Sequence, residues 1–99
     1  MSKETDVECA DLLKVLSDQT RLDVIRQLMD GPKHVNQINV ALNNVEQSLL
    51  SHHLKILRES GLVESERDGK AVLYRLSRKV EGRRQGKAIN LGCCKLSFD

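Results

Sequence analysis

The sequence predicts a mainly α-helical fold that carries one small β-hairpin. Two stretches, 34–42 and 46–60, repeat apolar residues at spacings of three and four, which is the period of an amphipathic helix. Soon after them, Asp68-Gly69 stands between two β-prone runs, a pattern typical of a two-residue hairpin turn. A helix, a tight turn, a second helix and a hairpin in this order predict a winged helix-turn-helix.

The two helices differ in length and are separated by a short break. The shorter one is expected to bury Val35, Ile38, Ala41 and Leu42. It ends at Asn43-Asn44, because asparagine tolerates the left-handed backbone at the end of a helix. The second helix begins near Glu46 and ends at Gly61, and its buried positions are expected to be Leu50, Leu54 and Leu57.

The opposite face of the second helix is polar. At about 100° per residue it presents Gln47, Ser48, Ser51, His52 and Lys55. A helix that enters the major groove of DNA needs donors and acceptors of this kind facing the base edges. These residues are therefore candidates for contact with double-stranded DNA, although an ordinary helical hairpin with a solvated face would look the same.

The hairpin that follows the second helix predicts the wing. On its second run Val72, Tyr74 and Leu76 alternate with more polar positions, as in a half-buried strand. Arg67 and Lys70 lie beside the turn at the tip. Cations placed there gain affinity for phosphate by releasing counterions from DNA.

The first third of the chain predicts two more helices. Cys9, Leu12, Leu13 and Leu16 share one stripe of a helix over 5–16. Asp18 caps the next helix, which runs to Met29 and points Leu22, Ile25, Leu28 and Met29 inward. Cys9 is either a buried small hydrophobe or a ligand that acts together with cysteines elsewhere in the chain.

LSDQTRLDVIRQL at 16–28, followed by SLLSHHLKILRESGLVESERDGKAVLYRL at 48–76, resembles the ArsR/SmtB family of winged-helix repressors. The most specific part is the S-x-H-L core at Ser51, His53 and Leu54. The match covers 10–77, roughly two thirds of the chain. The resemblance implies a homodimer that binds operator DNA without a cofactor and is released by a metal ion, a metalloid or a reactive sulfur species.

Composition agrees with this reading. Ninety-nine residues are expected to make one DNA-binding domain over 1–78 and a basic tail over 79–99. The net charge of +2 is uneven, since 1–45 carry five Lys/Arg and seven Asp/Glu, whereas 46–99 carry eleven and seven. No leader or long apolar run is recognised, so a cytoplasmic protein that does not contact a membrane is expected.

The histidines are poor candidates for metal ligands. Neighbouring helix residues diverge by about 100°, so His52 and His53 cannot easily hold one ion. His52 is expected to face DNA and His53 the flank of the core. His34 is interpreted as a residue at the start of a helix.

The tail, KVEGRRQGKAINLGCCKLSFD, is expected to pack at the dimer interface. Its first part is basic and is interpreted as a solvated linker, with phosphate contact as an alternative. Gly82, Gly86 and Gly92 argue against a long final helix. The apolar alternation slips at Cys93-Cys94, which suits a strand with a bulge, and a helix stays open as the alternative.

Cysteines are the remaining candidates for an effector site. The resemblance would place a Cys-x-Cys in NQINVALN or Asp and His pairs on a last helix, and this chain has neither. Cys93, Cys94 and Cys9 are therefore predicted to bind a thiophilic ion such as As(III) or Sb(III). In a cytosolic protein they are expected as thiols or ligands and not as a structural disulfide framework.

Other roles stay open at this point. The cysteine pair is incidental, or it senses oxidants or reactive sulfur, with Lys87 and Lys95 lowering the thiol pKa. A winged helix can also serve only as a protein-interaction module. An enzyme is not expected, because the sequence offers no glycine-rich phosphate loop, catalytic carboxylate pair or nucleophile elbow.

Overall fold

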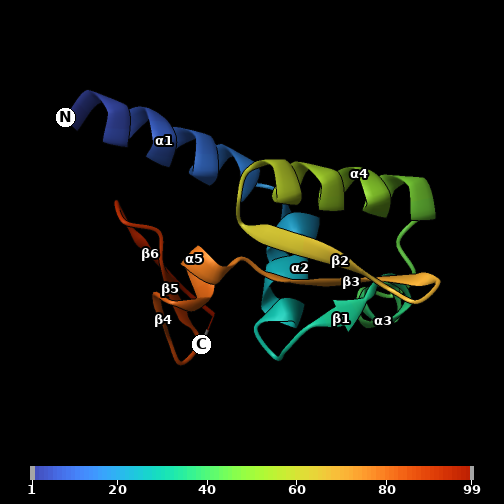
Figure 1. The fold of residues 1–99 in the computed structure, drawn as a ribbon. Helices are drawn as coiled ribbons and strands as arrows, with labels where there is room; N and C mark the ends of the chain where they lie inside the picture. Colours follow the sequence, from blue (N-terminus) through green and yellow to red (C-terminus); the bar gives the residue numbers. More distant parts are fainter. Residues whose placement is uncertain (1, 99) are drawn as a thin grey trace.

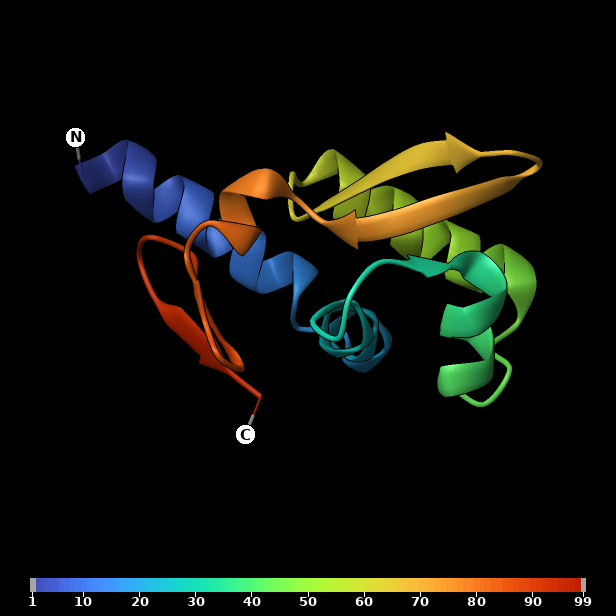
Figure 2. The same ribbon diagram turned by 60° about the horizontal axis from the view of Figure 1, so that its bottom comes forward.

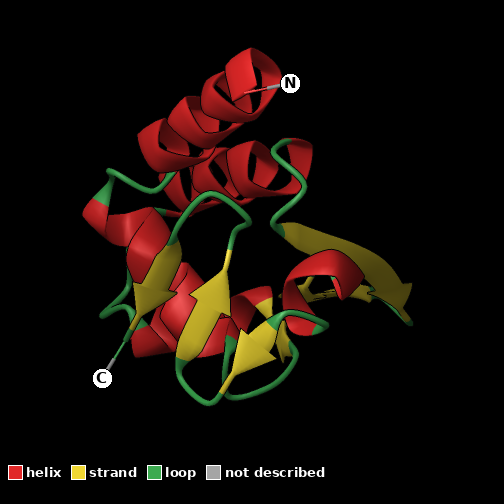
Figure 3. Ribbon diagram, turned by 90° about the vertical axis from the view of Figure 1, so that its left-hand side faces the viewer, coloured by secondary structure: helices red, strands yellow, loops and turns green. Residues whose placement is uncertain are grey.

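A computed structural model describes residues 2–98, with side-chain environments described from Cys9 onward. The helices are α1 Ser2–Val15, α2 Gln19–Leu28, α3 Val35–Ala41, α4 Gln47–Glu59 and α5 Arg78–Glu81. The strands are β1 Lys33–His34, β2 Val63–Asp68, β3 Ala71–Leu76, β4 Arg84–Gln85, β5 Ala88–Asn90 and β6 Lys95–Ser97. They form two separate antiparallel sheets, ordered β1-β3-β2 and β4-β5-β6 (Figures 1 and 3). No helix between residues 2 and 98 has both the length and the apolar character to cross a bilayer.

The molecule is elongated, with principal extents of 43 × 26 × 25 Å. Figure 2 shows the tip of the β2-β3 hairpin and the N-terminal end of α4 at one end of the molecule. The sheet β4-β5-β6, called the tail sheet below, lies beside α1 at the other end. The two predicted functional regions, the DNA-contacting surface and the cysteines, are therefore at opposite ends.

The predicted winged helix-turn-helix is confirmed. Asn43 and Asn44 both have a φ of 62°, the left-handed backbone expected between the two helices. In the wing, Asp68 pairs with Ala71, so that Gly69 and Lys70 form the two-residue loop and Gly69 has a φ of +66°. This shifts the turn by one residue from the predicted Asp68-Gly69. The pairing of β1 with β3 was not predicted, because two residues are too few to leave a pattern.

The core lies between α2, α3, α4 and the inner face of the wing. Its fully buried side chains include Val24, Ile25, Leu28, Ile38, Leu50, Leu54 and Leu57. The predicted inward face of α4 is confirmed by Leu50, Leu54 and Leu57, each at most 1% exposed. Two inward predictions are wrong, since Ala41 is exposed and Leu13 is 45% exposed. Both lie on helices that contact the core along a narrower stripe than their apolar residues cover.

The tail is folded differently from the prediction. It forms the three-stranded tail sheet, and Cys93-Cys94 lies in the connection between β5 and β6 and not at a bulge in one strand. The alternation slips at that point because the chain reverses, which Gly92 permits with a φ of +98°. Ile89 is only 2% exposed and belongs to the main core, so the tail packs against its own chain. The expected absence of a long final helix is confirmed by α5, which ends at Glu81.

Candidate DNA-contacting surface and three-cysteine site

The residues predicted to contact DNA are exposed. They are Gln47, Ser48, Ser51, His52 and Lys55 on α4, with Arg67 and Lys70 on the wing. The N-terminal end of α4 and the tip of the wing lie at the same end of the molecule, which brings the two groups to one region (Figure 2). The geometry suits a helix placed in a groove with a cationic hairpin beside it.

The start of α4 carries a carboxylate whose role the sequence did not reveal. Glu46 is the N-cap, and its Oε1 accepts a hydrogen bond from the backbone N–H of Leu49 at 3.0 Å. The hydroxyl of Ser48 also donates to this oxygen. The hydrogen bond from Ser48 is the main reason that the pKa of Glu46 is lowered. In this conformation Ser48 has its donor engaged, so the site presents its hydroxyl oxygen as an acceptor.

The wing is attached to the helix-turn-helix by a side-chain pair. His34 Nε2 lies 2.9 Å from Asp68 Oδ2 at the wing tip. The backbone N–H of His34 donates to Gln37 Oε1 at 2.8 Å, and His34 is the N-cap that precedes α3, which confirms its predicted place at the start of that helix. On the strands of the wing, Arg75 contacts Glu66 and lies 3.7 Å from Glu64. These contacts link β2 to β3 and the wing tip to α3.

His53 lies below the exposed face of α4, as predicted. It is 6% exposed, and its Nε2 lies 3.9 Å from Oδ1 of Asp18, the N-cap of α2. Among the described residues, none offers a hydrogen-bond partner to its Nδ1. Burial is the largest cause that lowers the pKa of His53, against the opposing effect of Asp18. His52 is exposed, and the two ring centroids are 6.0 Å apart.

We expect His53→Ala to lower the free energy of unfolding by about 1–3 kcal/mol and His52→Ala to leave it nearly unchanged. Because the folded pKa of His53 is lowered, the unfolded chain takes up a proton that the folded chain resists. Stability should therefore fall as the pH drops below about 6.5, and this dependence should flatten in His53→Ala. Thermal melts of the parent and both variants between pH 7.5 and 5.5 measure this. If His52→Ala destabilised the protein and His53→Ala did not, α4 would be rotated about its axis relative to this structure.

The three cysteines lie together. Their Sγ atoms are all within 4.8 Å of one another, although Cys9 is on α1 and the pair is in the tail. Cys9 and Cys93 form a disulfide with a Cα–Cα distance of 6.0 Å, and Cys94 Sγ lies 4.0 Å from Cys9 Sγ. The expectation of free thiols or ligands is thus wrong for Cys9 and Cys93, which are bonded to each other, and holds for Cys94. The separation of 84 residues gave no local signal of this pairing.

The connection between β5 and β6 holds the cysteine pair in place. The backbone N–H of Leu91 donates to the Cys94 carbonyl at 2.8 Å, and that of Gly92 donates to Asn90 Oδ1 at 2.8 Å. Cys93 is exposed in this connection, whereas Cys9 and Cys94 are half-buried. The interpretation of Cys9 as a buried core residue is therefore wrong, because its sulfur is bonded to the tail.

A pocket of 260 Å³ opens beside the disulfide. It is lined by Cys9, Leu12, Lys79, Arg83, Leu91, Gly92 and Cys93. Lys79 and Arg83 come from α5 and the residues that follow it, and neither was predicted near the cysteines. They line the same pocket as the two bonded cysteines because the tail folds back onto α1.

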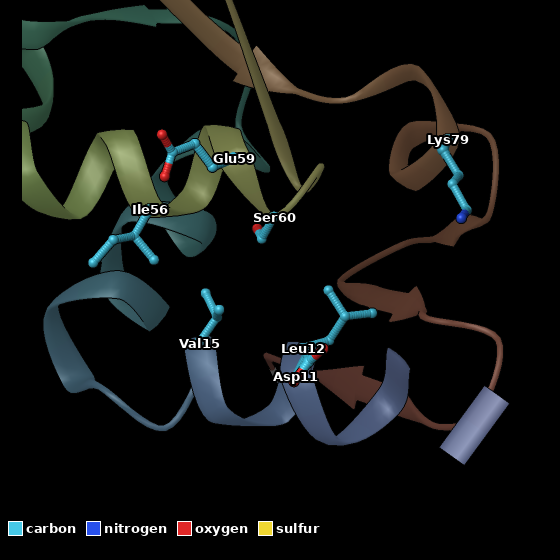
Figure 4. Close-up of a pocket in the computed structure, with 7 residues that line it drawn as sticks. All are labelled: Asp11, Leu12, Val15, Ile56, Glu59, Ser60 and Lys79. Carbon is cyan, nitrogen blue, oxygen red and sulfur yellow. The ribbon is translucent and has the colours of Figure 1, made fainter. Parts of the chain in front are cut away.

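A second pocket separates α1 from the C-terminal end of α4. Figure 4 shows Val15 of α1 across this pocket from Ile56 of α4 and from Ser60, the C-cap of that helix, with Leu12 on the same side as Val15. It has a volume of 470 Å³, and its other lining residues are Asp11, Glu59 and Lys79. Among the side chains described from Cys9 onward, none fills this groove between α1 and α4.

Comparisons with known proteins agree with this geometry. Residues 18–65 match the family model described as "Bacterial regulatory protein, arsR family". The chain is 42% identical over 67 residues to the HTH-type transcriptional repressor SmtB of Mycobacterium tuberculosis, covering 68% of this chain and 49% of that protein. It is 43% identical over 67 residues to the arsenical resistance operon repressor of Escherichia coli, covering 67% and 56%. The chain thus spans about half the length of the curated relatives it matches.

Solved structures give the same result. Reduced HlyU from Vibrio cholerae superposes with a TM-score of 0.72 at 32% identity, over 77% of this chain and 79% of that one. The homodimeric winged helix-turn-helix DNA-binding domain from Mycobacterium bovis gives a TM-score of 0.69 at 28% identity, over 77% and 69%.

Proposed function

This chain belongs to the arsR family of bacterial regulatory proteins, and from that premise we propose that it is a transcriptional repressor that a thiophilic metal or metalloid releases from operator DNA. The relatives are transcriptional regulators and not enzymes. The observation that carries the proposal of an effector is the group of three sulfur atoms within 4.8 Å of one another. We further propose that the protein acts in the cytoplasm.

For DNA binding we propose a homodimer. The M. bovis domain is described as homodimeric, and the winged-helix geometry is shared with it. Two α4 helices presented to successive major grooves require an imperfect inverted repeat as operator. We propose that α1 and the tail, residues 79–99, lie near the partner, at the end away from the wing tip.

Substitutions on α4 and on the wing should have different effects on DNA binding. Gln47→Ala or Ser48→Ala should relax sequence preference, with about 1–3 kcal/mol less discrimination at the affected base pair. Arg67→Ala or Lys70→Ala should weaken binding on all sequences and reduce the slope of log K against log salt by about 1. Fluorescence anisotropy across a salt series measures both effects.

A lysine of the tail gives a matched control for the wing variants. Lys95 is exposed on β6, in the tail sheet at the opposite end of the molecule. We expect Lys95→Ala to bind DNA like the parent. If Lys70→Ala and Lys95→Ala behave alike, the wing does not contact DNA. A parent chain that shows no salt-dependent binding to any inverted repeat would favour a protein-interaction module.

The proposed effector site uses all three cysteines. After the Cys9–Cys93 bridge is reduced, the three sulfurs offer soft ligands to As(III), Sb(III) or a comparable ion. The ion would then connect α1 to the tail. No cofactor is proposed for DNA binding itself.

The disulfide favours a second candidate function, a redox-controlled repressor. Formation of the bridge removes two electrons from Cys9 and Cys93 and attaches α1 covalently to the tail. Disulfides in cytosolic proteins are usually transient and catalytic or redox-sensing. One measurement distinguishes the two candidate functions, namely the DNA affinity of the oxidised and of the reduced chain without metal. A redox-controlled repressor shows a difference between these affinities, whereas a repressor that responds only to a thiophilic ion does not.

Either chemistry would act through α1. Its C-terminal half faces Ile56 of α4 and Ser60, the C-cap of that helix, across the 470 Å³ groove. A shift of α1 would change this contact and the arrangement of the two subunits, and so alter the spacing of the two α4 helices. Release of DNA needs a coupling free energy of about 1–3 kcal/mol between the two sites.

A further inference from the structure

We infer that the pocket beside the disulfide binds a small anionic thiol, which opens the Cys9–Cys93 bridge by thiol–disulfide exchange at Cys93. This inference rests on the proposed redox function and names the chemical class of its reductant. The ligand carries a carboxylate or a similar anionic group near its sulfur. A neutral thiol of similar size should use the site less well.

The charge of the pocket supports an anionic ligand. Lys79 and Arg83 line it together with both sulfurs of the bridge, and none of the seven lining residues among those described is acidic. Glu81, the acidic residue of α5, pairs instead with Arg84 at 3.3 Å. Two cations beside a disulfide raise the local concentration of anions.

Arg83 is the better placed of the two cations. A side chain added at Gly92 would meet Nη1 of Arg83 at 3.4 Å, so the guanidinium lies against the connection that carries Cys93. Lys79 also lines the neighbouring groove, which contains the carboxylates of Asp11 and Glu59. These negative charges oppose the attraction of Lys79 for an anion. The contribution of Arg83 to anion binding should therefore exceed that of Lys79.

The thiol–disulfide exchange forms one sulfur–sulfur bond and breaks another, so it needs no further oxidant or reductant. The thiolate of the ligand attacks Sγ of Cys93, and a new bond forms between these two sulfurs. The bond between Cys93 and Cys9 breaks, and its electron pair leaves with Cys9 as a thiolate. Cys93 is the sulfur attacked because it is exposed, whereas Cys9 is half-buried. The product is a mixed disulfide on Cys93 and an α1 that is no longer bonded to the tail.

The size of the pocket limits the ligand. Its 260 Å³ is slightly below the range of about 300–1,000 Å³ typical of pockets for drug-sized molecules. A thiol of a few heavy atoms with one or two carboxylates fits this space, and mercaptoacetate is a suitable probe. 2-Mercaptoethanol is the neutral probe of comparable size.

The test measures how fast each probe opens the bridge in the oxidised chain at low ionic strength. Quenching by alkylation and mass spectrometry gives the rate and locates the adduct. In Arg83→Gln the rate with mercaptoacetate, relative to 2-mercaptoethanol, should fall about fivefold, and in Lys79→Gln by less. The rate with 2-mercaptoethanol, whose reacting thiolate carries a single charge, should fall by less than the rate with mercaptoacetate in both variants.

Lys70→Gln, which changes a lysine at the wing tip, is the matched control and should keep the parent ratio. The expected adduct is on Cys93. An unchanged ratio in Arg83→Gln and Lys79→Gln, or an adduct on Cys9, would overturn the inference. Neither result would contradict release of DNA by As(III), because that release starts from the reduced chain.

Discussion

The Cys93→Ser/Cys94→Ser double variant should bind operator DNA as tightly as the parent and should not be released by As(III). The two sulfurs lie at the end of the molecule away from the wing tip, so their loss leaves the DNA-contacting surface intact. In the reduced parent, As(III) should weaken binding by about 5–150-fold, the usual range of allosteric coupling. Anisotropy titrations with arsenite under reducing conditions measure both quantities. If the double variant is released like the parent by each candidate effector, the tail is not the sensor.

Single variants separate the two candidate functions. Cys94→Ser keeps the Cys9–Cys93 bridge and removes only the third sulfur. It should lose most of the response to As(III) while the difference between its oxidised and reduced forms persists. Cys9→Ser should lose the redox response entirely and the As(III) response in part. A Cys94→Ser variant that responds fully to As(III) would contradict the three-sulfur site.

Leu54→Ala should lower the free energy of unfolding by about 2–5 kcal/mol. Leu54 is 1% exposed in the core beneath α4, so its truncation leaves a cavity that the neighbouring side chains fill only in part. Leu49 provides a control of the same chemistry on the same helix, because it is 47% exposed. Leu49→Ala should change stability by no more than about 0.5 kcal/mol. Urea titrations followed by circular dichroism measure both, and equal losses would place α4 in a different rotation.

The sequence predicted those parts of the fold that depend on neighbouring residues. The inward stripe of α4, the left-handed Asn43-Asn44 and the hairpin around Gly69 all follow from local patterns, and the structure confirms them. The placement of β1 beside β3 and of the tail against α1 depends on contacts between distant segments. Periodicity carries no information about such contacts.

The candidate sites divide in the same way. The exposed face of α4 was predictable from its period of 3.6 residues, whereas the hydrogen bond from Ser48 to Glu46 depends on side-chain conformation. The sequence suggested that Cys9 and the tail pair meet, from residue chemistry alone. It gave no sign of which two sulfurs are bonded, or that Arg83 lies beside them.

The Cys9–Cys93 bond closes almost the whole backbone into a ring. A protease that cuts the ring once, for example after the exposed Lys70 at the wing tip, leaves both fragments in one covalent molecule. The nicked chain would therefore migrate at full mass on a denaturing gel without reductant and as two short pieces with it. The size of the nicked chain on the gel therefore reports whether Cys9 and Cys93 are bonded to each other.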